Sequence, residues 1–530
     1  MCCKGGAGLA EAASVWSAGD HGGSFRAKYT ENANIYDDPT RFWHHGAENR
    51  IYIIIDLKSF YASVECVERG LDPMTAKLVV ADPDRSGGTI CLAVSPALKA
   101  LGVRNRCRVY EIPAHIDYIM APPQMQHYMD CSADIYEVYL QYIAKEDIHI
   151  YSVDEAFMDV TDYLDLYGMT AKELGNEIMN AVYDRTGIRS TCGIGTNMYL
   201  AKIALDITAK HSPDFIGILD EDRYKALLWD HRPITDFWMI ASGTSRRLSR
   251  MGIHTMREIA AAAMADDRLL YREFGVNAEI LIDHAFGRET VGISDIRNYR
   301  IKSKSLSTCQ VLLRDYSFEE TRVIISEMTD KLCLQMADRK LVTDSVTLTI
   351  VYSRSWADPS GFPAQPSKGT VRAPRADCSD MVWRALLQEE YEKIARRDAP
   401  IRTVGIWCNR VRSLADSGYQ YGLLDEQGNL YADFSEGSGS QDKARRIMST
   451  VINIRNRYGK NSILKGVSLD AAGTMMERNN QIGGHKSGTM DRVVKEKLQR
   501  EDRLTDFDRT LRAEAEAWHR QKTGSHMKTI

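Results

Sequence analysis

Three carboxylic acids stand where strands are expected to end. Asp56 follows the apolar run IYIII of residues 51–55, which is rich in β-branched residues and therefore favours a buried strand. Further along, IHIYSVDEAFMDV places Asp154 and Glu155 between two alternating segments, which predict a hairpin over residues 148–160. The sequence therefore puts two sets of carboxylates at strand ends.

Clustered carboxylates repel one another and are costly to remove from water, so they need a positive counter-charge. Mg²⁺ prefers oxygen ligands of this kind, and a pair of such ions can activate a hydroxyl and stabilise a transferring phosphoryl group. Taken singly, each acid also has a simpler interpretation. Asp56 could cap the helix that follows it, and Asp154 and Glu155 could be ordinary turn residues.

The composition is that of a multidomain protein without a membrane span. The chain has 530 residues, 44% of them hydrophobic, which is enough for roughly three to five domains. No apolar run is long enough to cross a bilayer, and the start of the chain lacks a convincing signal segment. We therefore expect a cytoplasmic protein.

The charge distribution and the cysteine spacing indicate which partners and metal sites the sequence favours. The net charge is −4, but the segment 300–412 holds 19 Lys and Arg against 14 Asp and Glu, which weakly favours a polyanion partner there. The eleven cysteines show no paired spacing typical of a zinc site. We expect most of them to be buried, reduced thiols.

In this part of the chain, segments with the apolar pattern of a strand alternate with segments that have the apolar period of a helix, which predicts an α/β sheet. We expect helices over 59–67, 96–102, 122–143, 172–183 and 200–209, and strands over 77–81, 87–94 and 190–195. Pro96 and Gly102 suit the two ends of the second helix, which carries Lys99. Near the acids, Lys99 could hold a nucleotide polyphosphate, although a solvated lysine is the commoner case.

Four motifs together carry a family resemblance: IIIDLKSFYASVE, SPALKALGV, YSVDEAFMDV and CGIGTNMYLAKIALDITAK. In this order they resemble the Y-family translesion DNA polymerases, particularly the UmuC-like branch of ImpB/MucB/SamB type, over residues 50–411. The resemblance implies an α/β multidomain right-hand polymerase. Its expected parts are an N-terminal extension (1–50) without fixed order, a palm (51–59 and 122–217), small fingers (60–121), a helical thumb (218–295), an α+β little finger (300–411) and a tail (412–530).

The resemblance also implies roles for individual residues. Asp56, Asp154 and Glu155 would be catalytic and, with the Leu57 carbonyl, would bind two Mg²⁺ ions. Tyr61 would be a steric gate whose ring occupies the space of a ribose 2′-hydroxyl. The other expected nucleotide contacts are Lys99 and Lys210 at the triphosphate and Ile90 and Leu92 over the nascent base pair. Pro96 departs from relatives of the DinB-like branch, many of which have a phosphate-binding tyrosine there.

Two further regions of the resemblance concern DNA. Residues 237–262 resemble the helix-hairpin-helix of the family thumb, but Met239-Ile240-Ala241 replaces the usual Gly-Ile-Gly, which should hinder close approach of the backbone to DNA. Residues 308–411 predict the order strand, helix, strand, strand, helix, strand of a little finger. Its candidate DNA-binding cations are Lys302, Lys304, Lys368, Arg372 and Arg375, each of which could instead be a solvated surface charge.

The tail contains one candidate partner motif. Gln420, Leu423 and Leu424 resemble the glutamine–leucine peptide by which bacterial polymerases bind the sliding clamp, with an apolar end that fills a pocket. We expect a flexible break at 437–439, a basic helix over 443–458, a glycine turn over 479–486 and a charged helix over 491–521. No chemistry is assigned to these tail segments.

The expected function is template-directed DNA synthesis from deoxynucleoside triphosphates on a primed template, in translesion synthesis and the SOS response to DNA damage. Accessory subunits are further possible partners. Two alternatives remain open: a catalytically silent, clamp-binding damage-response scaffold, and a nucleotidyl cyclase, which also uses palm-like carboxylates and two metals. The intact acids argue against the first, and the basic segment 300–412 would be unexplained by the second.

Overall fold

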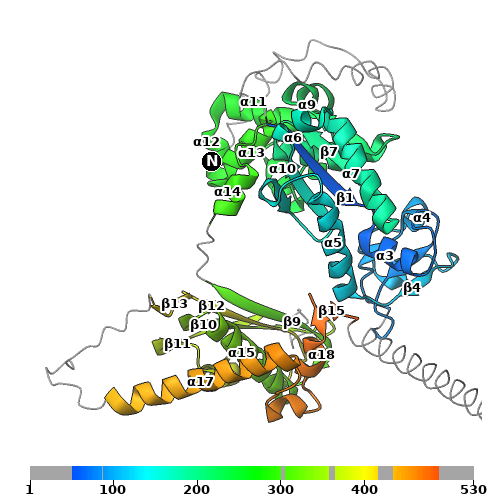
Figure 1. The fold of residues 1–530 in the computed structure, drawn as a ribbon. Coiled ribbons are helices and arrows are strands. Elements are labelled where there is room, and N and C mark those ends of the chain that lie inside the picture. Colours follow the sequence, from blue (N-terminus) through cyan, green and yellow to red (C-terminus); the bar gives the residue numbers. More distant parts are fainter. Residues whose placement is uncertain (1–49, 86, 300–304, 357–363, 416–433, 489–530) are drawn as a thin grey trace, which may run out of the picture. The chain divides into compact units, whose positions relative to one another are not determined.

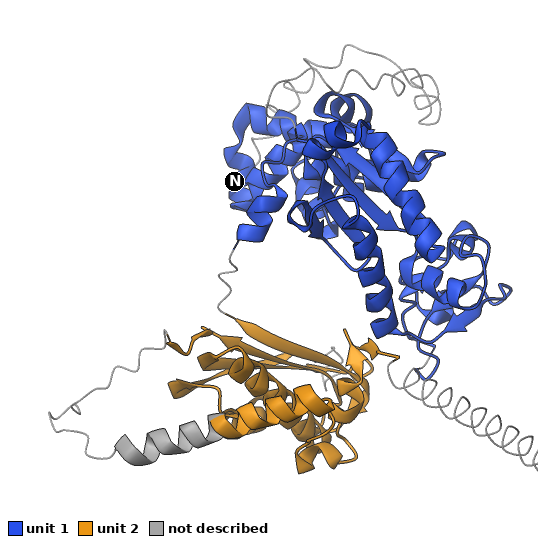
Figure 2. Ribbon diagram, in the orientation of Figure 1, with its two compact units in different colours: residues 1–299 blue, residues 300–530 orange. Residues whose placement is uncertain are grey.

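The chain folds into two compact units, Met1–Tyr299 and Arg300–Ile530 (Figures 1 and 2). The computed structural model describes residues 50–85, 87–299, 305–356, 364–415 and 434–488. Among these residues, no helix is long and apolar enough to cross a membrane.

A five-stranded mixed sheet lies at the centre of the first unit. Its strand order is β5-β6-β1-β7-β8; β1 is antiparallel to both neighbours, and β7 is parallel to β8. Ile53, Ile54 and Ile55 of β1 are fully buried, as expected for a strand covered on both faces. The strands are β1 (Tyr52–Leu57), β5 (Ile148–Ile150), β6 (Glu155–Asp159), β7 (Ser190–Gly195) and β8 (Ile216–Leu219).

Helices cover the two faces of this central sheet. On one face, Ile53 and Ile55 share a core with residues of α5 and α7; on the other, Ile54 packs in a cluster with Met198 and Ala201 of α8. The helices are α5 (Met125–Tyr139), α6 (Thr161–Tyr167), α7 (Ala171–Thr186) and α8 (Met198–Ile203).

Glycines allow the segment that begins with α8 to approach the sheet closely. A Cβ atom on Gly193 or Gly195 would overlap the backbone of Ala201, and one on Gly217 would overlap the Ala204 carbonyl. After Ile203 the chain continues as a π-helical turn (Ala204–Thr208) and a 3₁₀ turn (Ala209–His211). The predicted helix over 200–209 is therefore present, but it starts earlier and changes its winding where it crosses the glycines.

A second, three-stranded sheet has the order β3-β2-β4. The predicted strand over 87–94 is wrong for most of its length: only its last two residues form β3, and Ile90 makes an isolated bridge with Arg108. This sheet and its helices comprise α3 (Phe60–Glu68), β2 (Leu78–Val80), β3 (Ala93–Val94), α4 (Pro96–Ala100), a 3₁₀ turn (Val109–Glu111) and β4 (Ile119–Ala121).

The rest of the first unit is helical. The core of this helical region includes Tyr199 and Leu200 of α8. Because α8 also packs on the central sheet, one helix contributes to both parts. The helices are α9 (Glu221–Leu228), a 3₁₀ turn (Ile234–Asp236), α10 (Ser242–Arg250), α11 (Met256–Asp266), α12 (Arg268–Phe274), α13 (Asn277–Phe286) and α14 (Ile293–Asn298).

The second unit is an antiparallel sheet of order β11-β10-β12-β9 with helices on one face. Leu348, Ile350 and Ile406 point into the core with the helices. The observed order matches the six elements expected over 308–411. They are β9 (Leu306–Tyr316), α15 (Phe318–Asp338), β10 (Leu341–Tyr352), β11 (Ser367–Asp377), α16 (Asp380–Ile394) and β12 (Ile401–Asn409), followed by the short β13 (Arg412–Ser413).

Part of the tail belongs to the core of this unit, which the sequence analysis did not anticipate. Met448 and Ala472 are buried in the same cluster as the sheet residues. The expected break at 437–439 is wrong, because these residues lie inside α17. The tail elements are α17 (Phe434–Tyr458), a 3₁₀ turn (Gly466–Leu469), α18 (Met475–Asn479), β14 (Gln481–Ile482) and β15 (His485–Lys486). The helix expected over 491–521 lies outside the described residues.

Candidate active site

The strand register brings the three sequence-predicted acids to one end of the central sheet. Asp56 on β1 lies directly opposite Glu155 on β6. The next residue of β1, Leu57, donates its backbone N–H to the Asp154 carbonyl at 3.0 Å. The structure thus joins acids that are far apart in sequence, and it places the Leu57 backbone beside them.

A lysine that the sequence analysis did not identify lies among these acids. Lys202 of α8 is only 5% exposed, and its Nζ donates to Glu155 Oε1 at 2.6 Å. The same Nζ lies 3.2 Å from Asp206 Oδ2, one helical turn along the chain. The sequence signal for this pair is the i, i+4 spacing in AKIALD together with the glycines of STCGIG, which allow the helix to come close.

Electrostatics at the site follow from burial and crowding. Burial, then the charges of Glu155 and Asp154, raise the pKa of the Asp56 carboxyl to about 7, although Lys202 opposes the change. Burial also raises the pKa of Glu155 despite its lysine partner. Within the described part of the chain, no three His, Cys, Asp or Glu side chains converge as the ligands of one metal ion would. Glu155 instead contacts Lys202.

The donor set nevertheless fits hard cations. All candidate ligands are oxygen atoms, which hard divalent cations prefer, and the charges of Glu155 and Asp154 add to burial in raising the pKa of Asp56. A divalent ion would relieve that repulsion. Glu155 must then be shared between the ion and Lys202 or leave the lysine.

Tyr61, the expected gate, lies in the first turn of α3 against another aromatic ring. Its ring stacks on Tyr128 of α5 with centroids 4.5 Å apart and an angle of 16°. Tyr128 is fully buried and donates its hydroxyl to Glu65 Oε1 at 2.5 Å. Tyr128 and Glu65 were missed by sequence reasoning, because each looks like an ordinary residue of an amphipathic helix.

Positive groups gather at the N-terminus of α3. Ser59 precedes the helix with φ 50°, and Lys99 of α4 donates from Nζ to the Ser59 hydroxyl at 2.8 Å. Burial lowers the pKa of the Lys99 ammonium; Asp56 opposes the shift, and Lys210 adds to it. Lys210 lies 3.8 Å from Asp206 Oδ1. The two predicted phosphate-binding lysines are therefore within electrostatic range of each other and of the acids.

The two residues expected over the base pair differ in their surroundings. Ile90 is 39% exposed, while Leu92 is half-buried and packs against the core of the central sheet. The bridge between Ile90 and Arg108 holds this segment in place without a continuous strand.

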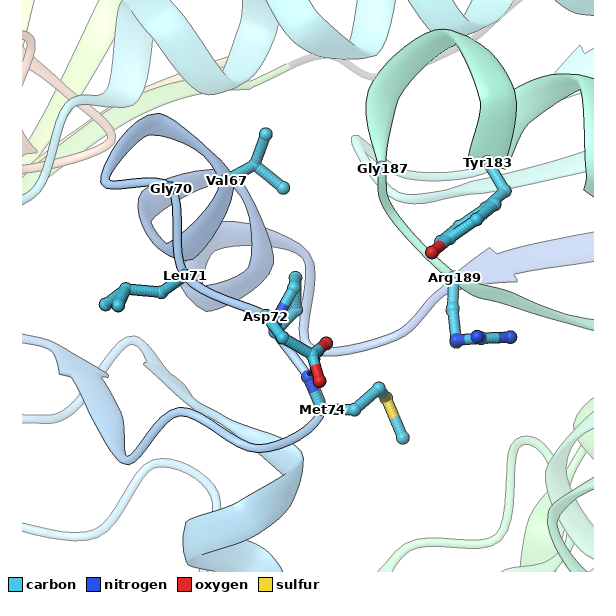
Figure 3. A pocket seen from close by; sticks show the side chains of 9 residues that line it. Val67, Gly70, Leu71, Asp72, Met74, Tyr183, Gly187 and Arg189 are labelled. Atoms are coloured by element: carbon cyan, nitrogen blue, oxygen red, sulfur yellow. Dashed lines mark hydrogen bonds between the residues drawn. The ribbon is translucent and has the colours of Figure 1, made fainter.

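A cavity of about 360 Å³ lies between the loop after α3 and the end of α7 (Figure 3). The guanidinium of Arg189 lies 4.9 Å from the ring centroid of Tyr183. Arg189 also accepts a backbone hydrogen bond from Lys58 at 2.9 Å, so this wall of the cavity continues into the end of β1. None of these residues was singled out from the sequence.

In the helical region, the turn at Met239-Ile240-Ala241, which replaces the Gly-Ile-Gly of the family, keeps a backbone conformation that favours glycine. Met239 has φ 69°, a region that favours glycine, and its side chain is 58% exposed. Ala241 then precedes α10, which carries Arg246, Arg247 and Arg250. The turn has formed without its glycines, with a methionine side chain at its tip.

The second unit presents an open sheet face opposite its helices. Lys368 and Arg372 are exposed on the edge strand β11, and Arg375 follows near its end. On β12, Trp407 lies over Gly405, where a Cβ atom would overlap the indole ring. The remaining predicted contacts lie outside the described residues: Lys302, Lys304, Gln420, Leu423 and Leu424.

Comparisons with known proteins agree with this arrangement. Residues 55–206 match the impB/mucB/samB family, and residues 303–422 match the impB/mucB/samB family C-terminal domain. The chain is 30% identical over 439 residues to UvrX of Bacillus subtilis (strain 168), a protein named for UV-damage repair; the match covers 82% of this chain and 97% of the relative.

Two further matches have polymerase names. A Bacillus subtilis protein named DNA polymerase IV 2 is 28% identical over 442 residues, which are 83% of this chain and 99% of that protein. In fold, the chain is similar to the solved structure of a Y-family DNA polymerase chimera, Dbh-Dpo4(243-245)-Dbh. That similarity has a TM-score of 0.52 at 19% identity and covers 68% of this chain and 99% of the other.

Proposed function

Because this chain belongs to the impB/mucB/samB family of Y-family DNA polymerases, we propose that it is a template-directed DNA polymerase that transfers deoxynucleotides to a primer 3′-hydroxyl in translesion synthesis and DNA repair. The observation that carries the proposal is the pairing of Asp56 with Glu155 across β1 and β6, next to Asp154. The names of the relatives, which refer to DNA polymerase IV and UV-damage repair, support the same activity.

Asp56, Asp154, Glu155 and the Leu57 carbonyl are the proposed ligands of two Mg²⁺ ions. When bound, such ions lower the pKa of a primer 3′-hydroxyl and stabilise charge on the transferring phosphoryl group. The chain's own contribution is to hold the acids at a strand end and to keep Glu155 oriented by Lys202 at 2.6 Å. Burial excludes bulk water from these charges and so strengthens their interactions.

The incoming nucleotide is proposed to lie at the N-terminus of α3. Helix N-termini bind phosphate through free backbone N–H groups, and Lys99 and Lys210 add charge there. The Tyr61 ring, backed by Tyr128, occupies the space of a ribose 2′-hydroxyl. Ile90 and Leu92 would contact the nascent base pair.

Primed DNA is the proposed macromolecular substrate. On the second unit, the open sheet face offers Lys368, Arg372 and Arg375 to phosphates, and Lys302 and Lys304 are added from the sequence. Three further proposals rest on the sequence resemblance. They are recruitment by a sliding clamp through Gln420, Leu423 and Leu424, dependence on accessory subunits, and a cytoplasmic, nucleoid-associated location.

Primer extension with magnesium tests this function. The intact protein should extend a primed template, and an Asp154→Ala, Glu155→Ala double variant should not. A matched control is the Asp162→Ala, Asp165→Ala variant, which removes two exposed acids of α6 and should retain activity. If a folded wild-type protein fails to extend the primer even with a sliding clamp present, the polymerase proposal is wrong and the alternative of a binding scaffold is favoured. Product formed from one triphosphate without template would indicate a cyclase.

A further inference from the structure

Lys58 is a cation near the candidate active site that no step described so far uses. It lies between Asp56 and Ser59, the residue that precedes α3. Its Nζ lies 3.8 Å from the ring centroid of Phe215. Among the described residues, no carboxylate lies within ion-pairing distance of this ammonium. A ring face attracts and orients a cation without neutralising it, so the contact with Phe215 holds the Lys58 ammonium in place.

This charge lies where positive charge is already concentrated. Lys99 donates to the hydroxyl of Ser59, the residue after Lys58, at 2.8 Å, and the Lys58 backbone N–H donates to the Arg189 carbonyl at 2.9 Å. The N-terminus of α3 supplies a further partial positive charge from its free N–H groups. A lysine immediately before a helix is unfavourable for the helix dipole, and two more lysines nearby increase the repulsion.

Most of the cations around Lys58 are held by neutral groups, so the repulsion among these positive charges persists. Lys99 is bound by a neutral hydroxyl, that of Ser59. Arg189 lies against the Tyr183 ring, as Lys58 does against Phe215. Of these four cations, Lys210 alone approaches a carboxylate within the part of the chain that the structure describes, that of Asp206 at 3.8 Å. Such a set of cations is stabilised by a ligand with several negative charges, and a triphosphate has more of them than Lys99 and Lys210 can match.

We propose that Lys58, held by Phe215, binds the terminal phosphates of the incoming nucleoside triphosphate and thereby makes the site selective for triphosphates over diphosphates and monophosphates. This inference rests on the proposed function, because it assigns a further positioning residue to the nucleotide site of the polymerase. It also explains why an aromatic residue occupies position 215, immediately before β8 and against the Lys58 ammonium.

The test is equilibrium binding of dATP, dADP and dAMP to the full chain with magnesium and primed DNA whose primer lacks a 3′-hydroxyl, so that no turnover occurs. Lys58→Met should weaken dATP binding about tenfold or more, as expected for loss of one charge-assisted contact. It should leave dAMP binding unchanged. Lys58→Arg should restore most of the affinity, and Phe215→Leu should cause an intermediate loss for dATP.

The matched control is Lys172→Met, since Lys172 pairs with Asp214 at 2.9 Å, beside Phe215, and its charge is already neutralised. Equal dATP affinity in wild type and Lys58→Met would overturn the inference while leaving the proposed function intact. Equal losses for dATP and dAMP would also overturn it, because they would indicate a structural role. A wild-type protein that binds none of the three nucleotides would contradict the proposed function itself. If Lys58→Met does not fold, Lys58→Arg and Phe215→Leu decide the question by the same nucleotide comparison.

Discussion

Lys202 is the residue that makes the acid cluster stable before any metal binds. Although burial lowers the pKa of its ammonium, Asp206 and Glu155 raise it more, so the lysine stays charged. Lys202 pairs with Glu155 and Asp206, and among the described residues no salt bridge joins a cation to Asp56 or Asp154. The site is thus half neutralised by the chain, which leaves a requirement for external positive charge.

Removal of Lys202 should therefore make stability depend on metal. In Lys202→Met, Glu155 and Asp206 lose their partner, and loss of one member of a buried pair costs roughly 3–5 kcal/mol. Magnesium should recover much of this loss, so the rise in thermal midpoint on adding magnesium should be larger than in wild type. Lys225→Met is the control, because its partner Glu221 lies on the surface at 3.5 Å. Equal magnesium-dependent shifts in all three proteins would contradict this role.

The raised pKa of Asp56 predicts a pH dependence. Because the folded value of about 7 exceeds the usual value near 4, the metal-free protein should lose stability as the pH rises between these values. Metal binding needs the ionised form, so Mn²⁺ affinity should fall by up to about tenfold per pH unit below pH 7 and level off above it. Spin-resonance titrations of wild type and Asp56→Asn measure this. A constant affinity from pH 6 to 8 in wild type would refute it.

The proposed gate at Tyr61 would depend on two rings, because Tyr61 stacks on Tyr128. Tyr61→Ala should raise ribonucleotide incorporation relative to deoxynucleotide incorporation by at least about tenfold, because the space of the 2′-hydroxyl opens. Tyr61→Phe should retain discrimination, since the ring remains. Tyr128→Leu should raise ribonucleotide use to a smaller extent by loosening the stacked ring. Unchanged discrimination in Tyr61→Ala would disprove the gate.

The convergence of Asp56, Asp154 and Glu155 was predictable, because each carboxylate stands at the end of an expected strand; their catalytic role stays a proposal. Lys202 and Tyr128 could not be found in this way, because their partners come from other elements. Sequence spacing says which helix face a residue occupies, but it does not say which distant acid that face meets.

At the scale of elements, the close contact between α8 and the sheet places Lys202 and Asp206 at the acids. Glycines at 193, 195 and 217 remove side chains that would hold the helix away, and the π-helical turn follows at the same place. The sequence predicted both the strand and a helix here. It did not predict the change of winding, because helix periodicity contains no information on what lies beneath the helix.

In the tail, by contrast, the sequence did not predict the contacts that hold the elements in place. Glu327 of α15 is buried and accepts hydrogen bonds from the Thr474 and Met475 N–H groups at 2.9 and 3.0 Å, so it caps α18. Lys465 pairs with Asp330 at 2.5 Å and also contacts Asp380. Each of these contacts joins residues far apart in the chain. Composition alone marked the segment only as charged and interrupted by glycines.

Glu327→Gln should therefore loosen the tail. Loss of the charge-assisted bonds to α18 should cost about 1–3 kcal/mol locally and speed hydrogen exchange over residues 466–486. Exchange in β10 and β12 should change less. Glu319→Gln is the control, since Glu319 is 72% exposed on the same helix. Unchanged exchange in the tail of Glu327→Gln would show that the cap contributes nothing.

At the scale of the whole molecule, the chain consists of two units with separate cores, and the proposed chemistry and the proposed DNA-binding sheet belong to different units. The sequence predicted roughly three to five domains rather than two units, and the division into palm, fingers, thumb and little finger stays a prediction; the order of elements over 308–411 was predictable from hydrophobic periodicity. The candidate clamp peptide at 420–424 lies outside the described residues and stays a prediction.

The acids of the first unit are proposed to catalyse DNA synthesis directed by a template. Single-nucleotide incorporation on four primed templates that differ only in the templating base tests it most directly, with each deoxynucleotide offered in turn. We predict that the complementary nucleotide is preferred on every template and that Asp154→Ala, Glu155→Ala abolishes all incorporation. The same nucleotide preferred on all four templates, or incorporation that survives in the double variant, would contradict the account.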